Sequence, residues 1–124
     1  MIDLAAAEEV FAASSDCTVG IEEEFAVLDA ASLDMVPRFE ELRDAAVAED
    51  PVLAASIAGE LISSEIEIRS GRGDDVHDAL RRQRDARNRL FALAEAHGVA
   101  LGATGTHPWA DYREQRNIDI EHYR

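Results

Sequence analysis

Apolar and polar positions alternate along Thr18–Asp29, which predicts a β-strand. Successive side chains of an extended chain point to opposite faces, so the odd-numbered apolar residues of this segment share one face. Glu22 and Glu24 share the other face, while Glu23 falls on the apolar side. The segment therefore predicts a strand with one apolar face and one acidic face.

A second segment, Leu61–Ser70, shows the same alternation, with isoleucines on one face and charged residues on the other. The isoleucines are Ile62, Ile66 and Ile68, and the charged residues are Glu65, Glu67 and Arg69. We therefore expect two acidic strands in one small domain.

Helical spacing of apolar residues predicts two helices. The first follows Pro37, begins near Phe39 and ends at Glu49-Asp50-Pro51. The second is long: Asp74 or Asp75 is suited to cap its start, and it runs to His97 with Gly98 as the residue that follows the helix. We expect it to cover the apolar face of the sheet with a single stripe. That stripe consists of Val76, Ala79, Leu80, Ala86, Leu90, Leu93 and Ala94.

Shorter patterns complete the expected elements and divide the chain into residues 1–17 and residues 18–124. The first part is a short helix or a frayed segment. The second is expected to contain a hairpin strand, a connector, a buried strand and one helical turn. In order, these segments are Leu4–Ala13, Leu33–Val36, Val52–Gly59, Val99–Thr104 and Trp109–Asn117.

Composition narrows the class of protein. A 124-residue chain with 47% hydrophobic residues is one domain at most and has enough apolar side chains for a core. The net charge of −14 argues against nucleic acid as a partner. Cys17 is the only cysteine, which excludes an internal disulfide, and we expect it to be a small buried hydrophobic residue. Without an export or membrane-spanning signal, a cytoplasmic location is expected.

The two acidic strands suggest chemistry. Carboxylates two residues apart on a strand, such as Glu22 and Glu24, are roughly 7 Å apart at the backbone and can reach one hard cation or two neighbouring ones. A solvated strand face is the more common reason for such a pair. The second strand, with Glu67, favours a shared metal-binding surface over that explanation.

Three motifs in register identify a family resemblance. They are T-V-G-I-E-E-E-F from residue 18, S-E-I-E-I-R-S-G from residue 64 and G-A-T-G-T-H-P-W from residue 102. Together they resemble the carboxylate-amine ligases, also called type 2 glutamate–cysteine ligases. The resemblance runs from about Thr18 to Arg124 and covers only the opening part of that family.

The resemblance implies an α+β fold that is part of a glutamine-synthetase-like curved, largely antiparallel sheet, with the long helix packed on its apolar face. It also implies an acidic face that holds Mg²⁺ and ATP. Such ligases activate a carboxylate as an acyl phosphate, and an amine then displaces the phosphate to give an amide. The implied substrates are L-glutamate and L-cysteine or another amine, joined into a product of the γ-glutamylcysteine kind.

Carried over by position, the metal ligands implied by the resemblance are Glu22, Glu24 and Glu67, and Glu65 is left open. Magnesium prefers oxygen ligands and usually takes one or two carboxylates together with phosphate oxygens. Glutamates that project from rigid strands suit that task, because phosphoryl transfer depends on positioned charge.

The resemblance implies three further residues as contacts of the nucleotide. Arg69 can hold a phosphate or a substrate carboxylate with its two-pronged guanidinium, although pairing with Glu65 or Glu67 is the simpler explanation. Thr106 and His107 lie in the G-T-H-P signature of the family. Family members often have arginine before the tyrosine near the end of this region, where this chain has His122 before Tyr123. No catalytic residue is assigned.

Two other functions compete with a ligase. One is another magnesium-dependent phosphotransfer or hydrolytic enzyme, and the other is a non-catalytic acidic interaction domain. The family's later motifs are absent from these 124 residues, so we expect the chain alone to be inactive as a ligase. Unpaired strand edges also favour association, so a homo-oligomer is among the expected assemblies.

Overall fold

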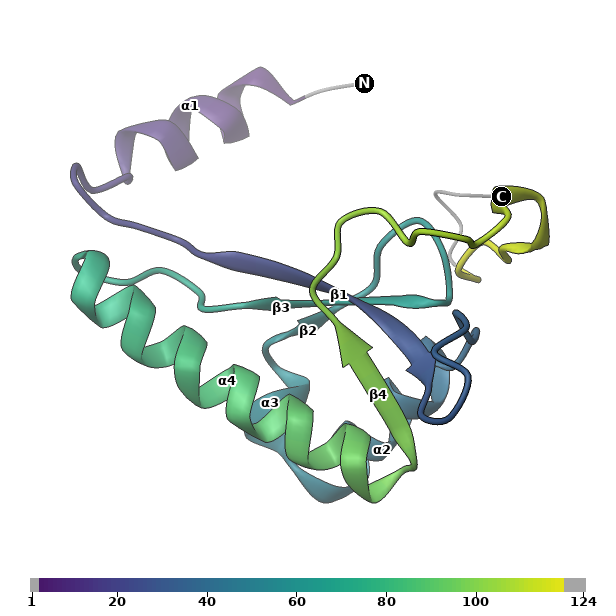
Figure 1. Ribbon diagram of the computed structural model, residues 1–124. Helices are drawn as coiled ribbons and strands as arrows, with labels where there is room; N and C mark the ends of the chain where they lie inside the picture. The colour runs from purple at the N-terminus through teal and green to yellow at the C-terminus, as the bar shows by residue number, and fades with distance from the viewer. Residues whose placement is uncertain (1–2, 120–124) are drawn as a thin grey trace.

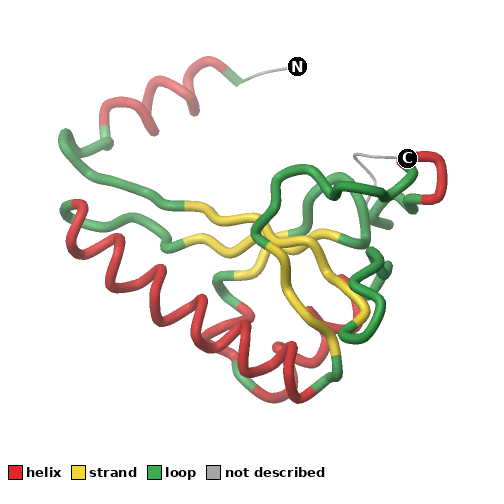
Figure 2. Tube along the Cα trace, in the orientation of Figure 1, coloured by secondary structure: helices red, strands yellow, loops and turns green. Residues whose placement is uncertain are grey.

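The computed structural model describes residues 3–119. Its centre is a four-stranded antiparallel sheet with strand order β2-β3-β1-β4. Helices α2, α3 and α4 lie on the same side of this sheet (Figures 1 and 2). This arrangement confirms the predicted α+β class with a long helix on the sheet. The strands are β1 Glu22–Asp29, β2 Ile57–Ala58, β3 Glu65–Arg69 and β4 Val99–Gly102, and the helices are α1 Leu4–Ala12, α2 Phe39–Glu49, α3 Pro51–Ala54, α4 Val76–Ala96 and the 3₁₀ turn η1 Tyr112–Glu114.

The pairing of β1 with β3 confirms the two predicted faces. Glu24 lies opposite Glu67, and Glu22 lies opposite Arg69, so the charged residues of both strands share one face. The regular strand β1 begins four residues later than predicted. Its partner β3 ends at Arg69, opposite Glu22. Residues 18–21 are held instead by an isolated bridge between Val19 and Gly73 and by hydrogen bonds between Ile21 and Ser70.

The second predicted strand is also shorter than expected. A turn at Ser63 and Ser64 precedes β3 and interrupts the alternation of side chains. Ile62 therefore does not share the apolar face with Ile66 and Ile68, as the sequence predicted. It forms an isolated bridge with Asn117 and lines a cavity beside Glu65 instead.

The caps of α4 determine where this helix begins and ends. The Asp75 carboxylate accepts a hydrogen bond from the Asp78 backbone N–H at 2.8 Å, and Gly98 adopts a φ of +69° after the last turn. Both predicted ends are thereby confirmed. The predicted burial of Leu80 is wrong, because its exposed fraction is 38%. The same holds for Val76, at 53%.

The residues of α4 that are buried against the sheet form a narrower stripe than the sequence predicted. The buried residues Ala79, Gln83, Ala86 and Leu90 recur at spacings of three and four and so lie on one side of the helix. Leu80 is one residue, about 100° of rotation, away from Ala79 and points off that line. A polar residue, Gln83, therefore takes a place in the contact line that an apolar pattern does not predict.

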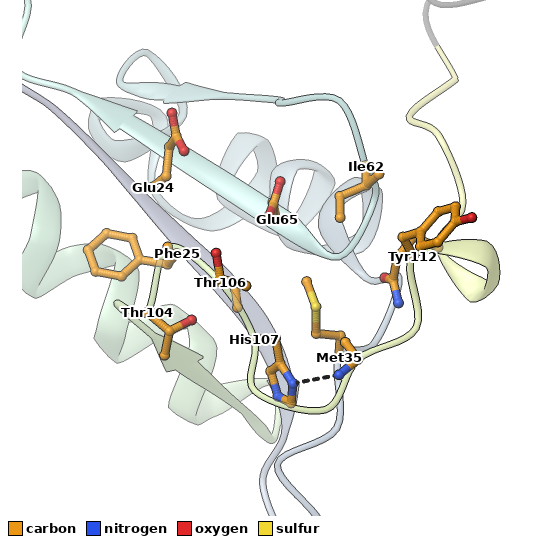
Figure 3. A pocket seen from close by; sticks show the side chains of 13 residues that line it. Glu24, Phe25, Met35, Ile62, Glu65, Thr104, Thr106, His107 and Tyr112 are labelled. Atoms are coloured by element: carbon orange, nitrogen blue, oxygen red, sulfur yellow. Dashed lines mark hydrogen bonds between the residues drawn. The ribbon is translucent and has the colours of Figure 1, made fainter.

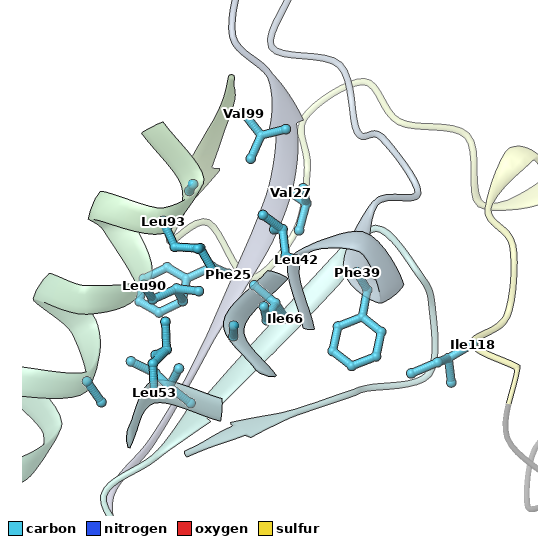
Figure 4. Packing of buried hydrophobic residues seen from close by; sticks show 14 residues of the cluster. Phe25, Val27, Phe39, Leu42, Leu53, Ile66, Leu90, Leu93, Val99 and Ile118 are labelled. Carbon is cyan, nitrogen blue, oxygen red and sulfur yellow. The ribbon is translucent and has the colours of Figure 1, made fainter. Parts of the chain in front are cut away.

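The core lies between the sheet and the three helices (Figure 4). Phe25 and Ile66 come from the sheet, while Leu42, Leu53 and Leu90 come from α2, α3 and α4. All five side chains are at most 1% exposed. Full burial of one such side chain stabilises the fold by about 1.5–3 kcal/mol, so this layer holds the sheet rigid beneath its charged face.

Helix α1 stands apart from the sheet in Figure 1 and contains no buried residue. It forms as a helix because the Asp3 carboxylate accepts hydrogen bonds from the backbone N–H groups of Ala5 and Ala6. The predicted burial of Cys17 is wrong. This residue is exposed, with a φ of +64°, because it lies in a turn between α1 and β1, outside the packed layers.

The remaining short predictions are confirmed in coarse form. The hairpin strand is a single bridge between Leu28 and Met35, and the connector contains α3 and β2. The strand predicted at Val99–Thr104 is β4, and its predicted burial holds for Val99 alone, since the other three residues of the strand are half-buried. The predicted helical turn near residue 110 is η1. In the described part of the chain, no helix is both long and apolar enough to cross a membrane.

Candidate functional site

Three carboxylates from different segments converge on the charged face of the sheet. Glu24 comes from β1, Glu67 from β3, and Glu60 from the loop between β2 and β3. One oxygen from each lies within 4.8 Å of the other two. Glu24 is exposed, Glu60 is half-buried, and Glu67 is only 3% exposed. We call these three residues the acidic group.

Repulsion within the acidic group shows in the protonation of Glu60. A hydrogen bond shared with Glu67 raises the pKa of Glu60 to about 7, and burial and the charges of Glu67 and Glu24 act in the same direction. A group of carboxylates that holds a proton near neutral pH has a charge excess that a divalent cation would remove.

Arg69 supplies a positive charge beside this group. Its Nε atom donates a hydrogen bond to Glu67 and lies 3.5 Å from an oxygen of Glu22. The bond to Glu67 is also the main reason why the pKa of Arg69 is raised. The simpler of the two sequence interpretations of Arg69, pairing with a neighbouring glutamate, therefore describes its contacts in the structure.

The structure brings together two of the three predicted metal ligands. Glu24 and Glu67 belong to the acidic group, whereas Glu22 lies opposite Arg69 with its side chain 63% exposed. The third carboxylate of the acidic group is Glu60, which the sequence analysis did not predict. Sequence reasoning missed it because it lies in a loop, where no alternation marks a face, and only the antiparallel return from β2 to β3 brings it beside Glu67.

The segment with the G-T-H-P signature forms a loop over the same face of the sheet. Gly105 has a φ of +64°, and the Thr106 backbone N–H donates to the Thr104 carbonyl at 2.7 Å, which closes a tight γ-turn. The region of φ that this turn requires favours glycine. Thr106 and His107 follow this turn, and both line a cavity under the loop (Figure 3).

Both ring nitrogens of His107 are used within the protein. Its Nδ1 accepts a hydrogen bond from the Ala110 backbone N–H at 3.2 Å, so its Nε2 carries the proton and donates to the Leu33 carbonyl at 2.8 Å. A second contact, from Trp109 Nε1 to the Asp34 carboxylate at 2.8 Å, joins the same two segments. His107 thereby ties the loop to the turn after β1, and its predicted role at a nucleotide stays a prediction.

A cavity lies between this loop and the sheet (Figure 3). Glu24 and Glu65 line it from the strands, and Thr106 and His107 line it from the loop. Arg69 is not among the lining residues, so the three predicted nucleotide contacts are divided between the cavity and the acidic group. Glu24 belongs to both and therefore connects them.

The acidic group fits a hard divalent cation. It offers carboxylate oxygens, which Mg²⁺ prefers, and small side-chain movements of the exposed Glu24 can bring its oxygen closer to the other two. The excess negative charge of the group also favours a cation, because the bound ion would reduce the repulsion between the carboxylates. His122 and Tyr123, where the chain departs from the family pattern, lie outside the described residues.

Known proteins with similar sequences carry names from one family. A Rubrobacter xylanophilus protein named "Putative glutamate–cysteine ligase 2-1" is 36% identical over 111 residues, which cover 90% of this chain and 29% of that protein. A Pseudomonas aeruginosa protein named "Putative glutamate–cysteine ligase 2" is also 36% identical, with the same two shares. The chain thus spans about a third of the length of the curated relatives it matches.

The sequence profile of glutamate–cysteine ligase family 2 matches residues 18–124, a range that contains the acidic group and the loop above it. Helix α1 and Cys17 precede that range. The chain therefore belongs to glutamate–cysteine ligase family 2.

Proposed function

We propose that this chain is part of an ATP-dependent carboxylate-amine ligase that forms an amide of the γ-glutamylcysteine kind through an acyl phosphate. The observation that supports this most is the acidic group, Glu24, Glu60 and Glu67, on a rigid sheet within the region that matches the family. Such a ligase needs a cation beside the transferring phosphoryl group, and its residues act mainly by positioning.

The proposed roles follow from where each side chain lies. Glu67 is held in place by its burial, so it is the fixed ligand for Mg²⁺, and Glu24 and Glu60 complete the carboxylate set. The bound cation would neutralise charge on the phosphoryl group of ATP. Arg69 would then be available to hold a phosphate or a substrate carboxylate, since a cation would compete with it for Glu67.

The loop above the acidic group would shape the substrate side. His107 and Trp109 hold it against the turn after β1, which keeps Thr106 over the cavity. The substrates that this proposal implies are L-glutamate and L-cysteine or another amine. The proposed location of the protein is the cytoplasm, where ATP and Mg²⁺ are available.

The test is release of ADP by the complete gene product with ATP, L-glutamate, L-cysteine and Mg²⁺. We expect release to require both amino acids and the cation, and to be lost in Glu67→Gln but kept in Glu95→Gln. Glu95 is a suitable control because it is exposed on α4, away from the acidic group. Hydrolysis of ATP that ignores both amino acids would contradict a ligase and favour another magnesium-dependent phosphotransfer enzyme.

A further inference from the structure

The cavity between the sheet and the loop is distinct from the acidic group, with which it shares only Glu24. Glu65 projects into it from β3, and Ile62 and Met35 form apolar parts of its wall. Thr104 and Thr106 face these residues from the loop (Figure 3). The cavity thus offers a carboxylate and hydroxyl groups beside an apolar surface, which is the composition of a small-molecule site.

The Glu65 carboxylate differs from the other half-buried carboxylates of this protein. Within residues 3–119 it has neither a hydrogen-bond nor an ion-pair partner, and Glu60, the other exception, bonds to Glu67. Every remaining half-buried carboxylate pairs with an arginine. These pairs are Glu23 with Arg87, Glu40 with Arg116, Asp50 with Arg89, Asp78 with Arg82 and Asp111 with Arg113.

The described residues of the cavity wall do not supply the missing positive charge. No arginine is among the described residues that line it, and both ring nitrogens of His107 are already hydrogen-bonded. A half-buried carboxylate of this kind is favourable for a ligand that brings a positive charge and N–H donors.

We propose that this cavity binds a small primary amine as its ammonium ion, with Glu65 accepting N–H hydrogen bonds and with Met35 and Ile62 contacting a short apolar body. The inference rests on the proposed function in one respect. Because Glu24 lines the cavity and also belongs to the acidic group, the cavity would place the amine substrate beside the activated carboxylate. It names Glu65 as the residue that selects an amine.

The probe for this site is n-butylammonium, and its neutral control is 1-butanol, which has a similar apolar body. Each is titrated into the ¹⁵N-labelled chain at pH 7 without ATP or Mg²⁺, with NaCl holding the ionic strength constant. We expect saturable shifts of the backbone amides of Ile62, Glu65, Thr104 and Thr106 with n-butylammonium and much smaller ones with 1-butanol.

Two variants separate the cavity from general attraction to an acidic protein. Glu65→Gln keeps the size of the side chain and removes its charge, and we expect it to weaken binding by about tenfold or more. Glu95→Gln removes the same charge from an exposed position on α4 outside the cavity, so its affinity should match that of the unmodified chain. The spectrum of each variant reports directly whether it is folded.

Equal shifts with 1-butanol, equal affinity in Glu65→Gln, or shifts spread over the whole acidic surface would each overturn the inference. The result is independent of the ligase assay. Binding of n-butylammonium without any ADP release by the complete gene product would contradict the proposed function alone. ADP release without binding in the cavity would contradict only this inference.

Discussion

Glu23 and Glu24 are neighbours in sequence, yet they lie on opposite faces of β1 and have opposite electrostatic surroundings. Glu23 accepts hydrogen bonds from Arg87 at 2.8 Å and from Gln83 at 3.0 Å, both on α4. Glu24 instead lies across from Glu67 and near Glu60. The first glutamate is paired as part of the fold, whereas the second belongs to a group with unbalanced charge.

The difference shows that the residue type alone does not decide the role of a glutamate here. Strand alternation decides which face it occupies, and the element packed on that face decides whether a positive charge meets it. On the face covered by the helices Glu23 has an arginine partner, whereas the opposite face, which we call the open face, has carboxylates whose charge a bound cation would balance.

The helix-covered face should carry most of the stability. Leu90 is fully buried in the core, so Leu90→Ala should lower the free energy of unfolding by about 2–5 kcal/mol. Leu80 lies on the same helix but is 38% exposed, so Leu80→Ala should lower the free energy of unfolding by less than about 1 kcal/mol. Urea denaturation of both variants measures this. Equal losses would show that α4 does not pack as described.

Removing the partner of Glu23 should have an intermediate effect. Arg87 pairs with Glu23 and stacks on the rings of Phe25 and Phe91, 5.5 Å from each centroid. Arg87→Ala should therefore cost about 1 kcal/mol, since the guanidinium is partly exposed.

The matched control for this variant is Arg84→Ala, because Arg84 is exposed on the same helix. Urea denaturation should give a nearly unchanged free energy of unfolding for it. If Arg87→Ala were no more destabilising than Arg84→Ala, the pairing of Glu23 would not contribute to the fold. A Glu23→Gln and Arg87→Ala double-mutant cycle would then give the coupling between the two side chains directly.

The unbalanced negative charge of the acidic group should make the stability of the fold depend slightly on pH. In the folded protein the pKa of Glu60 is about 7, above its ordinary value of 4.5. Between these two values the folded state binds more protons than the unfolded state, so this group lowers stability as pH rises through that range. Without metal, the unmodified chain should therefore lose stability relative to Glu60→Gln between pH 5 and pH 8.

Thermal melts of the two proteins across that range measure the difference, with Glu95→Gln as the control for loss of one surface charge. A constant difference between the unmodified chain and Glu60→Gln would contradict the raised pKa. Added Mg²⁺ should reduce the difference at pH 8 or reverse it, because the cation replaces the proton between the carboxylates.

The sequence predicted the parts of this molecule that local patterns determine. Alternation placed Glu24 and Glu67 on one face and Glu23 on the other, and the Asp75 and Gly98 caps gave both ends of α4. The three motifs of residues 18, 64 and 102 identified the family that the profile match shows. Each of these features depends on neighbours within a few positions.

The rest depends on contacts between distant segments. Glu60 joins the acidic group only because β2 returns antiparallel to β3, and no local pattern marks it. On α4, Gln83 is buried where the apolar pattern predicted Leu80, and the Gln83 side chain donates a hydrogen bond to Glu23, 60 positions away. The contacts of His107 likewise require the turn at Leu33, 74 positions away. Sequence patterns carry no signal for such pairings.

The most direct test of the contrast is Mg²⁺ binding to the folded chain, measured by isothermal titration calorimetry at pH 7.5 for the unmodified protein, Glu24→Gln and Glu23→Gln. Both variants lose one charge from adjacent positions of the same strand. We expect Glu23→Gln to bind Mg²⁺ with nearly unchanged affinity, and Glu24→Gln to bind it at least about tenfold more weakly, because a carboxylate ligand becomes a neutral amide. Equal affinities of the two variants, or no binding by the unmodified chain, would contradict a cation site on the open face of the sheet.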